Sequence, residues 1–110
     1  METGIVLYTI ESDGCLNGVY TNDDLGGEIF TETAKRRTPS TADRISGTYD
    51  AFYFDRDTLR NNARLTISPI PGATNRYTFI WRRARANTDT FVGEGYIMNN
   101  KQVAVAYREA

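Results

Sequence analysis

The sequence predicts an all-β protein in which a single antiparallel, up-and-down sheet of about eight strands closes into a barrel. Apolar and polar residues alternate with a period of two along most of the chain, and the segments between them are short and polar. The clearest alternation is at 76–82, where Tyr77, Phe79 and Trp81 fall on one face of a strand. Three rings on one face need an enclosed apolar space, so we expect the rest of the chain to surround them.

Length and charge limit the domain count and the classes of partner. The 110 residues are enough for one domain with its own core, spanning 1–110. Charged residues make up 25% of the chain and the net charge is −1, so we expect neither nucleic acid nor an anionic membrane as a partner. No apolar run is long enough to cross a bilayer as a helix. We therefore expect a soluble protein and favour the cytoplasm, although a single cysteine constrains the compartment little.

The residue types also argue against catalysis and metal binding. The chain has no histidine, which removes the usual general base and metal ligand, and Cys15 is its one cysteine. The acidic pairs at 23–24 and 55–57 lack the ligand spacing of a calcium loop, and we interpret them as turn carboxylates. Glu94 is expected to face outward. Arg82, Arg83 and Arg85 could grip an acidic ligand at the barrel mouth, but we favour a solvated loop. We expect no enzyme activity, no cofactor and no metal.

Eight segments show strand-like alternation, and polar segments rich in glycine, asparagine or aspartate separate most of them. The expected strands are 4–11, 15–22, 28–33, 45–54, 63–68, 76–82, 90–98 and 101–108. Segment 12–14 is a glycine turn and 99–100 is a short hairpin turn. We expect the longest loop at 35–43, and either a turn or one helical turn at 55–62.

Closure into a barrel follows from how these strands would pair. A flat sheet of this many strands would leave two open edges and one bare apolar face, whereas closure removes both problems. A two-sheet sandwich is the alternative, but the short gaps between strands disfavour the long crossovers of a Greek key. An eight-stranded barrel is either filled by side chains or holds one small ligand.

The inward face offers two interpretations, and the sequence leaves both open. If Trp81 points inward, the same parity sends a set of aromatic, apolar and amide side chains to the interior. They are Tyr20, Asn22, Tyr49, Tyr77, Phe91, Val103, Val105 and Tyr107. Glycines on this face either make room for rings opposite or leave room for a ligand. The interior is thus either packed or a narrow cavity lined by tyrosine hydroxyls and Asn22.

The outward face of the last strands is unusually apolar. Six side chains on three neighbouring strands should point away from the interior: Ile80, Val92, Tyr96, Met98, Ala104 and Ala106. Soluble monomers seldom expose a large apolar patch, so we expect a homo-oligomer, preferably an isologous dimer. The alternative is scattered exposed apolar residues without an interface.

Several short motifs resemble the avidin and streptavidin family in order and rough spacing. They are 16–23 with 25–26, 47–49, 77–81, 91–97 and 103–107. The resemblance covers most of the chain from Leu16 onward and implies an avidin- or lipocalin-like, calycin-type barrel. That family continues with another strand after the counterpart of Tyr107, whereas this chain has an additional strand before Leu16. We expect this leading strand to pair with the last one.

The resemblance also implies ligand contacts, but only some carry over. Asn22 and Tyr49 match positions that hydrogen-bond the ligand, and Trp81 and Phe91 match apolar walls. Tyr107 stands where the family has tryptophan, and Ala51 stands where it has threonine. With these polar partners missing, we do not expect tight binding of biotin.

The function predicted is a non-catalytic module that binds a small apolar or aromatic ligand in the barrel interior. The expected ligand-binding residues are Asn22, Tyr49, Tyr77, Trp81, Phe91 and Tyr107. The alternative is a structural or protein-interaction module with a packed interior, which forms a homo-oligomer through its C-terminal hairpins.

Overall fold

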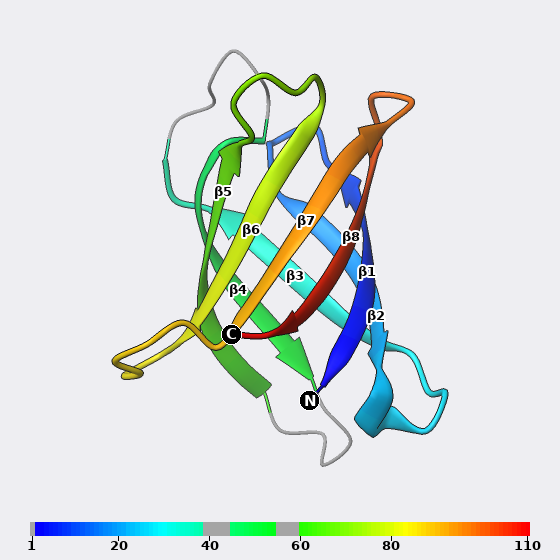
Figure 1. Ribbon diagram of the computed structural model, residues 1–110, viewed down its shortest axis with the longest axis vertical. Helices are drawn as coiled ribbons and strands as arrows, with labels where there is room; N and C mark the ends of the chain where they lie inside the picture. Colours follow the sequence, from blue (N-terminus) through cyan, green and yellow to red (C-terminus); the bar gives the residue numbers. More distant parts are fainter. Residues whose placement is uncertain (1, 39–44, 55–59) are drawn as a thin grey trace.

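The computed structural model describes residues 2–38, 45–54 and 60–110. Its strands form one closed antiparallel barrel in which each strand pairs with its neighbours in the chain (Figure 1). The strands are β1 (Thr3–Ile10), β2 (Leu16–Asn22), β3 (Phe30–Arg36), β4 (Gly47–Phe54), β5 (Arg60–Pro69), β6 (Arg76–Arg83), β7 (Phe91–Met98) and β8 (Gln102–Glu109). A short 3-10 helix, η1 (Asp23–Leu25), follows β2. The predicted all-β, up-and-down barrel is confirmed.

The barrel closes where the first strand meets the last. β1 and β8 pair in antiparallel register from Thr3 opposite Arg108 to Thr9 opposite Gln102. Both termini lie at one end of the barrel (Figure 1). The expected pairing of the leading strand with the final strand is therefore confirmed, and the described strands have no open sheet edge.

Turn chemistry explains two of the connections. Asn99 and Asn100 both have positive φ, 42° and 63°, as a two-residue hairpin turn of the right twist requires. Asn22 caps η1, since its side-chain oxygen accepts a hydrogen bond from the backbone N–H of Asp24 at 3.0 Å. This cap holds η1 over the end of the barrel where the termini lie.

The third strand differs most from prediction. It begins later than expected and runs through Lys35 and Arg36, which we had assigned to a loop. Arg36 faces inward, and its hydrogen bonds include one from Nε to the Thr38 carbonyl oxygen, one to the Tyr49 hydroxyl and one from Nη2 to the Ser46 carbonyl oxygen at 2.6 Å. Those bonds keep a charged residue in the sheet. The part of the predicted loop at 39–43 falls outside the described residues. The turn predicted at 55–62 is wrong at its end, because β5 begins at Arg60 and Asn61 and Asn62 pair with β4; residues 55–59 fall outside the described residues.

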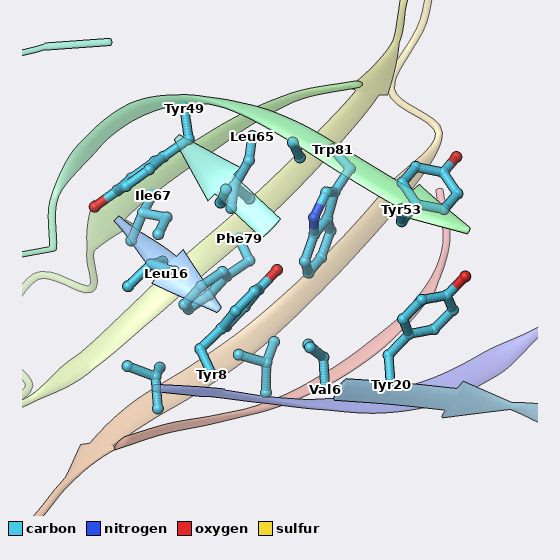
Figure 2. Close-up of a cluster of buried hydrophobic side chains, with 14 of the residues drawn as sticks. Val6, Tyr8, Leu16, Tyr20, Tyr49, Tyr53, Leu65, Ile67, Phe79 and Trp81 are labelled. Atoms are coloured by element: carbon cyan, nitrogen blue, oxygen red, sulfur yellow. The ribbon is translucent and has the colours of Figure 1, made fainter. Parts of the chain in front are cut away.

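The interior divides into two halves along the barrel axis. Far from the termini, the side chains are fully buried; this packed half comprises Tyr8, Leu16, Ile45, Tyr49, Leu65, Ile67, Phe79 and Val103. Figure 2 shows Tyr49 and Ile67 on one side of Phe79, with Tyr20 and Tyr53 on the other. The two interpretations of the interior therefore apply to different halves, because the second half is not filled.

Candidate ligand cavity

A cavity of about 270 Å³ occupies the half of the barrel nearest the termini. Its lining comes from η1, from every strand except β5 and from the residue that precedes β1. The lining residues are Glu2, Val6, Tyr20, Asn22, Asp24, Leu25, Glu32, Tyr53, Trp81, Arg83, Phe91 and Tyr107. We call this the cavity half.

Aromatic rings form much of the wall. The ring centroid of Tyr107 lies 5.6 Å from that of Trp81 and 5.6 Å from that of Phe91, the latter pair edge to face at 82°. Tyr20 and Tyr53 form a second edge-to-face pair at 6.1 Å. Alternation along β6, β7 and β8 sends Trp81, Phe91 and Tyr107 inward, as the sequence predicts, and alternation along β2 and β4 does the same for Tyr20 and Tyr53. The wall presents both ring faces and ring edges to a ligand.

A buried carboxyl, Glu32 on β3, lies at the inner part of the cavity. Its side chain is only 7% exposed. The Tyr8 hydroxyl and the Trp81 Nε1–H both donate to its Oε2 atom, the latter at 3.3 Å. Burial raises the Glu32 pKa to about 7, and the two hydrogen bonds oppose that rise only in part. Glu32 therefore exchanges a proton near neutral pH.

A glycine makes the Tyr8 contact feasible. A Cβ atom at Gly18 would lie 2.7 Å from the Tyr8 ring. Only glycine at this position therefore lets the ring lie over the β2 backbone and reach Glu32. Gly95 likewise makes room for Phe79, whose ring lies 2.9 Å from where its Cβ would be. At both positions the inward glycines accommodate rings, which is one of the two roles that the sequence allowed.

The mouth of the cavity carries charge of both signs. Burial raises the pKa of Glu2 to about 7, with further contributions from Asp24 and Glu109 nearby. Across the opening, Arg83 donates from Nε to the Tyr53 hydroxyl at 2.9 Å. Its guanidinium also lies 5.8 Å from the ring centroid of Phe91.

Four of the six predicted ligand-binding residues meet at this cavity. They are Asn22, Trp81, Phe91 and Tyr107. Asn22 donates from Nδ2 to the Tyr107 hydroxyl at 3.1 Å, and that hydroxyl donates to the Thr21 carbonyl oxygen at 3.4 Å. Burial raises the pKa of Tyr107 to about 12, so the hydroxyl keeps its proton at neutral pH.

The other two predicted residues, Tyr49 and Tyr77, do not line the cavity. Tyr49 is fully buried in the packed half, where its hydroxyl donates to the Ile45 carbonyl oxygen at 2.7 Å and accepts from Arg36 at 2.5 Å. Tyr77 is also buried, close to the start of β6 and thus at the far end of the barrel. The parity of both residues was predicted correctly, but parity does not report depth along the axis.

Sequence reasoning did not single out Glu32, Tyr53 or Glu2 as site residues. Arg83 was considered as a mouth residue, and it lines the cavity from the end of β6 rather than from a loop. A signal existed for Glu32, since it shares the parity of Phe30 within one strand and alternation would turn both inward. Glu32 was not predicted as an inward residue because it is charged and because the strand was predicted to end at residue 33. Tyr53 shares the parity of Tyr49, which alternation predicts to face inward, but its position beside the cavity depends on the register of β4 against β3.

Other candidate residues have ordinary surroundings. Glu94 is exposed and forms an ion pair with Arg76, while Arg82 pairs with Asp89 at 2.9 Å. Cys15 is a half-buried free thiol. Within 2–38, 45–54 and 60–110, no group of histidine, cysteine or acidic side chains could hold a metal ion. No helix in those segments is long and apolar enough to cross a membrane.

The outer apolar surface extends further than predicted. The six predicted side chains face outward on β6, β7 and β8, with Tyr96 51% exposed. Across the closing seam, Leu7 lies opposite both Ala104 and Val19 in the sheet register. We call the resulting surface the seam patch; its exposed members are Ile5, Leu7, Val19, Ile29, Tyr96 and Ala106.

Searches against protein-family models, curated proteins and solved structures found no match to this chain. The structure supports the architectural part of the resemblance described above, a closed eight-stranded antiparallel barrel of calycin-like form.

Proposed function

We propose that this protein is a non-catalytic barrel that binds a small apolar or aromatic molecule in the cavity half. The observation that carries this proposal is the cavity itself, which stays open beside a packed half made of the same types of residue. Its aromatic walls and few polar groups have the composition of ligand pockets. At about 270 Å³ it is at the small end of their range, which favours a compact ligand.

Binding explains the lining better than catalysis does. The sequence has no histidine, so a hydroxyl or thiol nucleophile in this chain has no imidazole base. Glu32 engages Tyr8 and Trp81 rather than a nucleophile. We infer that its chemistry serves recognition.

The cavity can also be compared with the ligand site that the resemblance to avidins implies. Two features argue against a biotin-like ligand. Tyr49 lies in the packed half, and Asn22 uses one of its two amide hydrogens on Tyr107. A ureido carbonyl would therefore meet few donors, in line with the sequence expectation that biotin is not bound tightly.

Fluorescence titration with 1-aminoanthracene, a flat neutral probe, tests the proposal. Val6→Phe should fill the cavity, since Val6 lines it at 3% exposure, and Thr66→Phe, at a position of similar size on the outer face of β5, is the matched control. We expect saturable 1:1 binding by the wild type and by the control, and at least tenfold weaker binding by Val6→Phe. Absence of saturable binding, or equal affinity in all three proteins, would contradict the proposal. Native mass spectrometry of the purified protein would show any ligand that is retained.

We also propose, as a second candidate, that two copies associate through the seam patch. Five large apolar side chains are 38–67% exposed there, a concentration that favours an interface. Because the described strands leave no sheet edge open, contact must be face to face, and an isologous pair places the same patch on both copies.

Sedimentation equilibrium of two charge variants tests the dimer. Leu7→Lys and Tyr96→Lys put a charge into the seam patch, whereas Phe54→Lys alters an exposed apolar residue on β4, outside it. We expect the two patch variants to shift toward monomer and the control to stay dimeric. A monomeric wild type would refute the dimer.

A further inference from the structure

Hydrogen-bond donors and acceptors are unequally available in the cavity. The donors deep in the cavity are engaged with protein acceptors: Trp81 uses its only N–H on Glu32, and the Tyr107 hydroxyl donates to the Thr21 carbonyl. The Tyr20 hydroxyl donates to the Phe54 carbonyl. A ligand that relied on accepting hydrogen bonds would therefore find few donors free.

Acceptors are in the opposite situation. Both hydrogen bonds to Glu32 reach Oε2, and no described residue donates to its Oε1 atom. No described side-chain oxygen is both fully buried and without a partner, so Oε1 is accessible, and because Glu32 lines the cavity a ligand inside could approach it. A donor on the ligand would pair with this oxygen, and such a bond is stronger in an enclosed site than in open water.

The charged side chains of the lining also favour a ligand that donates hydrogen bonds, because most of them are acidic. Among the described lining residues, Glu2, Asp24 and Glu32 are acidic, and Arg83 is the cationic side chain. Arg83 lies at the mouth and is engaged with Tyr53 and with the face of Phe91. The interior therefore offers a carboxyl group surrounded by aromatic rings, which is the environment that attracts an organic cation.

We propose that the cavity binds a small organic cation, a protonated amine or amidine on a flat apolar group, with its N–H donating to Glu32 Oε1 and its apolar part between Trp81, Tyr107 and Phe91. This inference rests on the proposed function and names the chemical class of its ligand. A cation opposite Glu32 also offsets the burial that disfavours the ionised carboxylate, so that binding favours the charged form. An anion would instead meet Glu32 and Glu2.

Three probes of one shape separate charge from shape: 1-naphthylmethylamine, 1-naphthylmethanol and 1-naphthoate, titrated by calorimetry at pH 7.5. We expect the amine to bind at least about tenfold more tightly than the alcohol, because a charge-assisted hydrogen bond adds to the ring contacts. The carboxylate should bind most weakly of the three.

Glu32→Gln removes the charge at nearly constant volume and should bring the amine within about threefold of the alcohol. Glu28→Gln is the matched control, since Glu28 is an exposed acid at the same end of the barrel and does not line the cavity. Glu2→Gln, at the mouth, should cost the amine about two- to threefold.

Each outcome decides between the two proposals. If the three probes bind equally, or if the carboxylate binds best, the cation proposal is wrong while a binding cavity stands. If none of them binds, both proposals are wrong. An amine preference that survives in Glu32→Gln would exclude Glu32 as its origin. Should Glu32→Gln fail to fold, the order of the three probes on the wild type and on Glu2→Gln still decides.

Discussion

The two halves of the barrel are built from the same strands and similar residues, yet one is solid and the other hollow. In the packed half, the Tyr49 hydroxyl donates a hydrogen bond to the Ile45 carbonyl oxygen and accepts one from Arg36. In the cavity half, Glu32 has an oxygen to which no described residue donates a hydrogen bond, and the rings of Trp81 and Tyr107 border open space. In the packed half, the buried tyrosine hydroxyl has its partners within the protein. In the cavity half, one carboxyl oxygen is left for a ligand to pair with.

Removal of one ring from each half gives the largest contrast. Phe79→Ala should destabilise the protein by about 3–5 kcal/mol, because it opens a void among fully buried side chains. Phe91→Ala should cost about 1 kcal/mol, since Phe91 is half-buried and borders a space that already exists. Urea denaturation of both variants measures the difference. Equal losses would mean that the cavity half is packed in solution.

The pH dependence of stability is the next contrast, and it concerns Glu32. Its pKa is raised from 4.5 to about 7 on folding, so the folded state holds the proton more tightly. Stability should therefore fall as pH rises from 4.5 to 7 and level off above that range. The shift corresponds to about 3 kcal/mol as an upper bound. Glu32→Gln has no such proton and should lack this loss.

The measurement is urea denaturation of the wild type, Glu32→Gln and the control Glu28→Gln at pH 5 and pH 8. Glu2 has a raised pKa with the same sign, but it is present in all three proteins and cancels in the comparison. If the free energy of unfolding changed with pH to the same extent in the wild type and in Glu32→Gln, Glu32 would have an ordinary pKa. Its carboxyl group would then be hydrated rather than buried.

The smallest contrast concerns single hydroxyls. Tyr49→Phe should cost about 1–2 kcal/mol, because it leaves the Ile45 carbonyl and Arg36 short of a partner in a buried site. Tyr53→Phe should cost under about 0.5 kcal/mol, because its partner Arg83 is exposed to water. Thermal unfolding distinguishes these values. A larger loss for Tyr53→Phe would reverse the assignment of the halves.

The fold was predictable because alternation specifies which side chains face inward. Tyr77, Phe79 and Trp81 are all buried, as their spacing predicted, and the hairpin at Asn99 was found from its turn residues. Strand ends were less predictable. Lys35 and Arg36 look like loop residues until the hydrogen bonds of Arg36 to a distant segment are known.

The cavity could be predicted only in part, because alternation gives the face but not the depth. Asn22 and Trp81 were expected at the site and line it, whereas Tyr49 shares their parity but lies at the other end. Glu32 was missed because its partners come from β1 and β6, which no local pattern relates to β3.

A crystal structure of the protein soaked with 1-naphthylmethylamine tests the central claim most directly. The account predicts a naphthyl ring between Trp81, Tyr107 and Phe91, with the amine nitrogen within hydrogen-bond distance of Glu32 Oε1. Cavity walls collapsed onto one another in both the free and the soaked crystals would contradict it.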